Sequence, residues 1–217
     1  MTYTGNVGPG TAPAVRELAN LTITKVSVGH MDNNAYLLRC RSTGEQVLID
    51  AANDAERLLE LVGDAGLSTV ITTHQHYDHW YALEDVLDAT GATSVAHAAD
   101  AEPMPRVDRT VEDGQTVAVG DCSLEVIHLV GHTPGSIALL YQDPGGSAHL
   151  FTGDSLFPGG VGATGGNAEN FTSLINDVER KIFDRLPDDT WFYPGHGNDS
   201  TLGKERPSLP EWRARGW

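Results

Sequence analysis

Residues Thr73–His79 read THQHYDH, which places three histidines and one aspartate within six consecutive positions. The stretch follows the β-branched run Thr69–Thr73, which predicts a short strand that leads directly into His74. His74 and His76 are two residues apart, so both side chains project to the same side of an extended backbone. Imidazole and carboxylate are ligands that suit zinc and other first-row metals. Four such groups on one turn exceed what one tetrahedral catalytic site usually takes from a single motif, which indicates two metal ions. A solvated histidine-rich loop is the non-catalytic alternative.

Three shorter motifs each come soon after a predicted strand. They are Gly131–Ser136 (GHTPGS), Thr152–Ser155 (TGDS) and Pro194–Gly197 (PGHG). Taken singly, each is weak, because a histidine beside a glycine is more often a turn residue than a ligand. In α/β sheets, however, ligands gather at the carboxyl ends of strands. The four motifs together therefore predict one composite site.

Strands and helices alternate in both halves of the chain, which predicts the α/β class. The two halves have a similar element order, and no linker separates them, so we expect a single domain over residues 1–217. Within it, residues 1–18 are expected to form a loosely held lead-in segment, and residues 201–217 a C-terminal tail. Helices are predicted at Trp80–Ala89 and at Phe171–Leu186.

The composition excludes several classes of function. The chain has 217 residues with 40% hydrophobic and 20% charged side chains, as in ordinary soluble proteins. No apolar run is long enough to span a bilayer, so no membrane partner is expected. The formal net charge of −16 repels phosphate backbones and disfavours nucleic acid as a ligand. With membrane and nucleic acid disfavoured, the expected partner is a small-molecule substrate. The sequence leaves the oligomeric state open.

The amino-terminal residues lack a basic start followed by an apolar stretch, so no signal peptide is predicted. Cys40 and Cys122 are too few to form a disulfide framework. We interpret both as buried thiols in a reducing compartment, with a single bridge as the alternative. A cytoplasmic location is therefore expected.

The motif order T-H-x-H-x-D-H, G-H-T-P-G-S, G-D-S-L-F and P-G-H-G resembles that of the metallo-β-lactamase-fold hydrolases. Within them the chain is most similar to single-domain glyoxalase II-type thioester hydrolases, which are hydroxyacylglutathione hydrolase-like proteins. The resemblance covers roughly residues 26–197. It implies an αββα sandwich with a binuclear metal site in the cleft between the two halves.

The resemblance also implies a ligand set around two divalent metal ions. The ligands would be His74, His76 and His132 for the first ion, Asp78, His79 and His196 for the second, and Asp154 as a bridge between them. Asp78 would additionally steer the attacking group and is the expected catalytic residue. Asp50, at the end of an apolar strand, corresponds to a carboxylate that supports the metal loop in this family. Zn²⁺ is the favoured metal, with Fe and Mn as alternatives, because imidazole and carboxylate accept all three.

The expected activity is hydrolysis of a thioester or related small ester by a metal-bridging hydroxide, because water held between two dications loses a proton near neutral pH. The alternatives are a mononuclear iron persulfide dioxygenase-like oxidoreductase, a lactone hydrolase, and a non-catalytic metal-binding module. True β-lactamases of this fold usually lack an acid at the position of Asp154, which disfavours antibiotic hydrolysis.

Two departures from the glyoxalase II pattern concern the substrate. Relatives of that type typically carry Gly-x-Gly-Arg-x-Asp after the G-D-S/T-L-F motif, whereas Gly160–Gly166 reads GVGATGG and lacks the Arg and the Asp. The larger enzymes also have a glutathione-binding helical region, whereas this sequence ends at Trp217, soon after His196. Glutathione is therefore not the expected thiol.

Several other residues have an ordinary interpretation. We expect four histidines to be structural or exposed: His30, His97, His128 and His149. Tyr77 and Trp80 flank the predicted ligands, and the sequence leaves open whether they line the cleft or pack in the core.

Overall fold

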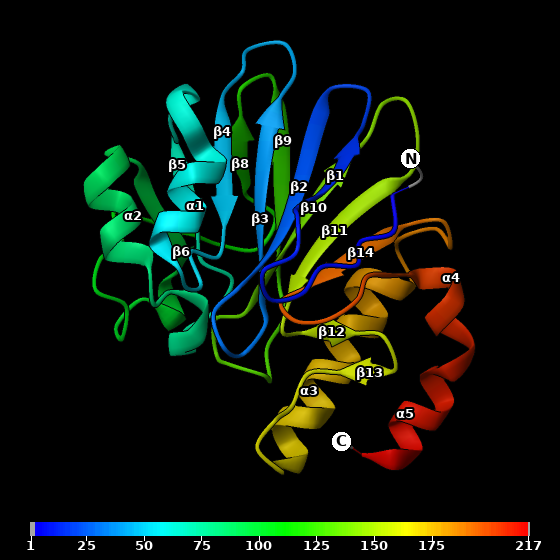
Figure 1. Cartoon of the computed structure of the whole chain (residues 1–217). Helices are drawn as coiled ribbons and strands as arrows, with labels where there is room; N and C mark the ends of the chain where they lie inside the picture. The colour runs from blue at the N-terminus through cyan, green and yellow to red at the C-terminus, as the bar shows by residue number, and fades with distance from the viewer. Residues whose placement is uncertain (1–2, 217) are drawn as a thin grey trace.

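Two β-sheets pack face to face, and helices cover the outer face of each (Figure 1). The computed structural model describes residues 3–216. The first sheet has the strand order β1-β2-β3-β4-β5-β6-β7, and the second has the order β15-β14-β11-β10-β9-β8. This is the αββα sandwich that the resemblance implied, and the α/β class is confirmed.

Within the described part of the chain, the first sheet has seven strands and the second has six. The first sheet consists of β1 (Ala14–Glu17), β2 (Leu21–Val28), β3 (Asn33–Cys40), β4 (Gln46–Ile49), β5 (Thr69–Ile71), β6 (Thr93–His97) and β7 (Arg109–Val111). The second consists of β8 (Thr116–Val119), β9 (Cys122–His128), β10 (Ile137–Gln142), β11 (Ala148–Gly153), β14 (Trp191–Pro194) and β15 (Ser200–Thr201), while β12 (Leu156–Phe157) pairs with β13 (Gly160–Val161). The α-helices are α1 (Ala55–Val62), α2 (Leu83–Thr90), α3 (Ala168–Val178), α4 (Leu202–Glu205) and α5 (Leu209–Arg215).

Period-2 alternation sorts side chains between the layers. In β10, Ile137, Leu139 and Tyr141 face the core between the sheets, whereas Ala138 and Leu140 face the helices. Because both faces of this strand are covered, it is apolar almost throughout, as central strands with two buried faces are. The sequence pattern thus sets both the inner core and one outer core.

Parallel pairing brings several strand ends to one edge of the sandwich. β4, β5 and β6 run parallel in the first sheet, and β11 runs parallel to β14 in the second. At this edge the sheets are joined by backbone hydrogen bonds, because Ile137 N–H donates to Thr73 O (2.9 Å) and Asn34 N–H donates to Gly195 O (2.7 Å). The loops that carry the predicted site therefore leave the sheets next to one another.

Both ends of the chain are more ordered in structure than the sequence suggested. Residues Ala14–Glu17 of the expected lead-in form β1, which pairs antiparallel with β2. Most of the expected tail forms α4 and α5. On α5, Trp212 is buried against the outer core of the second sheet and meets Phe183 edge to face at 6.1 Å between ring centroids.

Two predicted helices differ at their ends. The helix expected at Trp80–Ala89 begins only at Leu83, because Tyr77–His79 form a separate 3₁₀ turn. The helix expected at Phe171–Leu186 starts earlier, where the Asn167 side chain accepts hydrogen bonds from two backbone N–H groups of the first turn. It ends as a π-helical turn over Glu179–Phe183.

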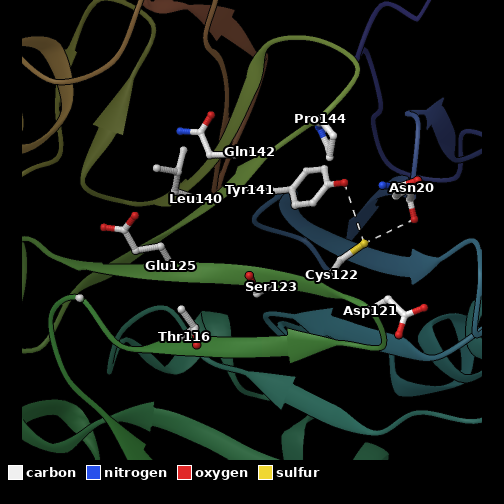
Figure 2. Close-up of a pocket in the computed structure, with 11 residues that line it drawn as sticks. Asn20, Thr116, Asp121, Cys122, Ser123, Glu125, Leu140, Tyr141, Gln142 and Pro144 are labelled. Carbon is white, nitrogen blue, oxygen red and sulfur yellow. Dashed lines mark hydrogen bonds between the residues drawn. The ribbon is translucent and has the colours of Figure 1, made fainter.

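Cys40 and Cys122 are free and buried, which confirms the expected burial. Cys122 borders a cavity of about 420 Å³ beside β9 and β10, where its thiol lies 3.5 Å from Asn20 O and 3.9 Å from the Tyr141 hydroxyl (Figure 2). No histidine is among its lining residues in the described structure. Within residues 3–216, no helix is both long and apolar enough to cross a bilayer.

The burial of Trp212 leads to a prediction about stability. Trp212→Ala should lower the free energy of unfolding by about 3–5 kcal/mol, because a large buried ring leaves a cavity. Urea denaturation followed by circular dichroism measures this. Glu211→Ala, an exposed neighbour on the same helix, is the control and should change stability by less than about 0.5 kcal/mol. Equal midpoints for Trp212→Ala and the wild type would show that α5 does not contribute to the core.

Candidate metal centre

All seven predicted ligands lie in one cluster at the edge where the strand ends converge. The structure brings their ligand atoms together in three overlapping groups, each with its atoms within 4.8 Å of one another. The groups are His74 with His76 and His132, His74 with His79 and Asp154, and Asp78 with His79 and His196. They come from the loops after β5, β9, β11 and β14.

Histidine nitrogens of the cluster face each other at hydrogen-bonding distances. In one group, His74 Nε2 lies 3.1 Å from His76 Nδ1, and the His132 ring is 4.6 Å from the His76 ring between centroids. In the other, His79 Nε2 lies 3.2 Å from His196 Nε2. Asp78 Oδ2 is 3.6 Å from His79 Nε2 and 3.4 Å from His196 Nε2. Each group is therefore a compact set of convergent ligand atoms.

The Asp154 carboxylate lies between the two outer groups. Its Oδ1 is 3.4 Å from His79 Nε2, while its Oδ2 is 3.7 Å from His132 Nε2 and 3.6 Å from His196 Nε2. The two oxygens thus reach imidazoles that belong to different groups. The carboxylate therefore lies between the two groups, in contact with both.

Two buried atoms of the cluster have no hydrogen-bond partner. They are Oδ1 of Asp154 and Nε2 of His132. A buried polar atom without a partner costs free energy, so native structures pair nearly all of them. Both atoms face the centre of the cluster, and a divalent cation there would satisfy both. The nitrogen and oxygen donor set therefore fits metal ions.

The pKa shifts of His74 and Asp154 suit metal binding, whereas that of His79 reflects the carboxylates beside it. Burial, followed by the neighbouring histidines, holds the pKa of His74 well below its usual value, which keeps the imidazole in the neutral form that binds metals. Burial raises the pKa of Asp154, but the close polar contact with His79 and the charges of the surrounding histidines outweigh it and lower that pKa. Burial opposes a charge on His79 too, yet the carboxylates of Asp154 and Asp50 raise its pKa to about 10. A metal ion would neutralise the same carboxylates and displace that proton.

Comparison with known protein families agrees with the geometry. The sequence model of the metallo-β-lactamase superfamily matches residues 28–196. The chain belongs to this superfamily. It is 37% identical over 181 residues to a hydroxyacylglutathione hydrolase of Rhodospirillum rubrum, which corresponds to 82% of this chain and 67% of that protein. The chain spans about two thirds of the length of the hydroxyacylglutathione hydrolases that it matches.

Two solved structures of the superfamily illustrate its range. The B3 metallo-β-lactamase BLEG-1 superposes with a TM-score of 0.77 at 26% identity, over 88% of this chain and 99% of that one. ETHE1 from Myxococcus xanthus gives a TM-score of 0.76 at 30% identity, over 88% of this chain and 84% of that one. A metallo-β-lactamase and ETHE1 therefore share this fold, so the fold by itself does not specify the reaction.

Asp50 orients the loop that carries the first three histidines. Its side chain is buried and accepts hydrogen bonds from both the backbone N–H and the hydroxyl of Thr73, each at 2.8 Å. Its Oδ2 also lies 2.9 Å from His79 Nδ1, which leaves Nε2 of that ring facing the cluster. The Thr73 hydroxyl in turn lies 3.0 Å from His74 Nδ1. One carboxylate thus fixes the rings of two candidate ligands.

Asp100 has a similar role that sequence reasoning missed. It is fully buried and accepts hydrogen bonds from Gln75 N–H (2.9 Å), the Thr133 hydroxyl (2.5 Å) and Gly135 N–H (2.7 Å). It therefore ties the His74–His79 loop to the loop that carries His132. Its position just after parallel strand β6 was the signal that could have identified it, because polar groups at such strand ends gather at one edge.

Asn33 and Lys25 support the side of the centre that holds Asp78 and His196, and neither was predicted. Asn33 Nδ2 donates to Asp78 Oδ2 at 2.8 Å. Lys25 lies on the inward face of β2, fully buried, and pairs with Asp199 at 2.7 Å. Its ammonium also donates to Gly197 O at 2.8 Å, which holds the backbone directly after His196. A buried lysine in a strand gives no sequence signal for such a role.

The glycine-rich loop packs directly on the centre. His132 Nδ1 lies 2.7 Å from Ala163 O, so a carbonyl of this loop orients the ring. A Cβ on Gly162 would come within 1.7 Å of Asp154 O, so only glycine permits this approach. The loop residues Gly160–Gly166 thus position candidate ligands.

The remaining histidines lie outside the cluster. His149 is buried and its Nδ1 lies 2.8 Å from the Tyr193 hydroxyl, while the rings of His97 and His128 stack at 3.9 Å. Trp80 is half-buried and donates from Nε1 to Gln75 O, whereas Tyr77 is exposed beside Asp78. Of the two aromatic residues that flank the motif, Trp80 therefore packs partly in the interior, whereas Tyr77 lies at the surface beside the centre.

The contacts of Asp100 predict the effect of its removal. Asp100→Ala should lower the free energy of unfolding by about 3 kcal/mol, because three donors lose a charged acceptor. It should also weaken Zn²⁺ binding by about tenfold or more, because the two ligand loops lose their common anchor. Denaturant titration and competition with a chromophoric chelator measure the two effects.

The control for this experiment is Asp88→Ala. The Asp88 side chain is exposed, and its Oδ1 makes a long contact of 3.8 Å with Nη1 of the exposed Arg106. It should leave both quantities unchanged within about 0.5 kcal/mol. Wild-type zinc affinity in Asp100→Ala would show that the loops hold their positions without this carboxylate.

Proposed function

We propose that this chain is a binuclear metallohydrolase that cleaves a thioester or a related small ester. The observation that carries the proposal is the place of Asp154, whose two oxygens reach histidines of two separate ligand groups. A single mononuclear site would not need ligand atoms in both groups. The identity to a hydroxyacylglutathione hydrolase supports the same class of reaction.

The two outer groups support a ligand assignment for two ions. His74, His76 and His132 would hold one ion, Asp78, His79 and His196 would hold the other, and Asp154 would serve both. Divalent ions held there would acidify a water molecule and polarise a substrate carbonyl. Zn²⁺ is the favoured ion, because imidazole and carboxylate suit it well.

The protein side chains contribute position and charge. Burial raises the pKa of Asp78, but the Asn33 hydrogen bond and the charge on His79 outweigh it, so the carboxylate stays ionised. Its Oδ2 accepts from Asn33, which fixes the orientation of the carboxyl group at the mouth of the centre. An ionised, oriented carboxylate there can align the attacking water by hydrogen bonding. A thiolate leaving group requires little protonation, so no separate general acid is needed.

The first test concerns the bridge. Asp154→Ala should lower kcat by about 10³-fold or more and reduce bound metal from two ions per chain to one or none. The reason is that the Asp154 carboxylate would set the distance between the two metal ions. Metal analysis and a thioester assay measure this, and circular dichroism checks the fold. Asp121→Ala, an exposed aspartate beside Cys122, is the control. Two bound ions and retained turnover in Asp154→Ala would contradict the bridge.

The second test concerns the substrate. S-Lactoylglutathione should have a kcat/KM about tenfold or more below that of thioesters with smaller, uncharged carriers, because the anionic tripeptide has few anchors and remote contacts position the carbonyl. Steady-state kinetics on matched thioesters, a lactone and a β-lactam decide the class. If the glutathione thioester were the best substrate, the argument from the missing arginine would be wrong. One iron per chain with oxygen uptake on a persulfide would instead support the oxidoreductase alternative.

A further inference from the structure

A cavity of about 360 Å³ opens directly beside the candidate metal centre. One part of its wall belongs to the centre and consists of Asn33 and Asp78. Another part consists of Met31, from the loop between β2 and β3, with Tyr77 and Tyr81 from the segment before α2. The volume lies in the range of small-molecule sites.

This wall is the main concentration of exposed apolar side chains in the described structure. Over residues 3–216, four large hydrophobic residues are strongly exposed, and three of them line this cavity: Met31 (52%), Tyr77 (57%) and Tyr81 (55%). The rings of Tyr77 and Tyr81 meet edge to face at 5.0 Å between centroids, which gives the wall a defined shape. Apolar groups gathered on one polar-rimmed surface mark a binding site.

The cavity is continuous with the site of chemistry. Asn33 in its wall donates to Asp78 Oδ2, and Met31 O lies 3.2 Å from His196 Nδ1. A ligand in the cavity would therefore be next to two candidate ligands of the second ion. A substrate held there can place its carbonyl at the centre while another part of it stays among the aromatic rings.

The charge of the wall selects against anions. None of the described residues that line the cavity is Lys or Arg, and Asp78 contributes a carboxylate. The imidazole of His30 and the amide of Asn53 complete the polar part of the wall. The whole chain carries a net charge of −16, which further repels anions. Uncharged apolar groups meet no such penalty. Burial against Met and Tyr side chains gives them a favourable free energy.

We propose that this cavity binds an uncharged apolar group of the substrate, aromatic or aliphatic, and that Met31 and Tyr81 determine specificity for it. The inference rests on the proposed hydrolase function, whose substrate class it narrows. The apolar group can be carried on the acyl side or on the thiol side of the ester, since the same wall chemistry suits both.

The test compares three thioesters. They are S-acetyl-N-acetylcysteamine, its S-phenylacetyl counterpart, and the acetyl thioester of benzyl mercaptan. The specificity measured is kcat/KM for an aromatic thioester divided by kcat/KM for S-acetyl-N-acetylcysteamine. Tyr81→Ala and Met31→Ala should each lower this ratio by about tenfold, because removing part of an apolar pocket loses discrimination of that size. A fall for the phenylacetyl compound assigns the cavity to the acyl group, and a fall for the benzyl compound assigns it to the thiol side.

Two controls accompany these variants. Val15→Ala removes an equally exposed apolar side chain (53%) on β1, away from the cavity, and should leave the ratio unchanged. Tyr81→Phe keeps the ring and should retain most of the ratio. Because Met31 and Tyr81 are more than half exposed, their variants are expected to fold, which thermal melting checks.

A binding measurement separates this inference from the proposed function. The thioether S-benzyl-N-acetylcysteamine cannot be hydrolysed, so calorimetry reports its binding whether or not the chain cleaves thioesters. Weaker binding to Tyr81→Ala and Met31→Ala than to the wild type supports the cavity even if no thioester is turned over. Equal binding to all variants, no binding to the wild type, or an unchanged substrate ratio would overturn it.

Discussion

The buried carboxylate of Asp154 is the feature on which the rest of the site depends. Its oxygens lie within 3.4–3.7 Å of imidazole nitrogens from three separate loops. A charge in such a place is costly unless it is compensated, and the surrounding histidines compensate it only if they carry protons. Metal ions offer another solution, because they are attracted by the same carboxylate and by neutral imidazoles at once. The arrangement of the loops follows from this requirement.

Much of the surrounding structure holds the loops against one another. Asp50 orients the loop after β5 from the first sheet, and Asp100 connects that loop to the loop carrying His132. The buried pair of Lys25 and Asp199 holds the backbone after His196. These groups are buried polar residues with several hydrogen bonds each, so displacing one loop would leave donors or acceptors unpaired. Precision at the centre thus comes from cross-connections between loops as well as from the strands.

The same edge of the sandwich that gathers the polar ligands also exposes an apolar wall. Met31, Tyr77 and Tyr81 remain open to solvent although the cores nearby are closely packed. Tyr77 lies between the candidate ligands His76 and Asp78 in the chain, and its exposed ring is carried by the same 3₁₀ turn as Asp78 and His79. The cavity and the candidate metal centre therefore share the segment that contains Tyr77 and Asp78.

The sequence by itself determined the α/β class and the strands that precede each motif, because period-2 alternation is a local property that survives without tertiary contacts. The seven candidate ligands and the supporting role of Asp50 were predicted from the resemblance of the motif order to the metallo-β-lactamase-fold hydrolases. The sequence did not indicate β1 or α5, short segments that pack on β2 and on the outer core of the second sheet.

Only the tertiary structure decided which distant groups meet. Asp100, Asn33 and Lys25 have no distinctive local pattern, and their roles arise from contacts with residues between 25 and 174 positions away. The pairing of β11 with β14 and the backbone bonds between the two sheets place the four motifs around one point. Residue types and spacing fix what chemistry is available, whereas burial and long-range hydrogen bonding fix where those groups stand relative to one another.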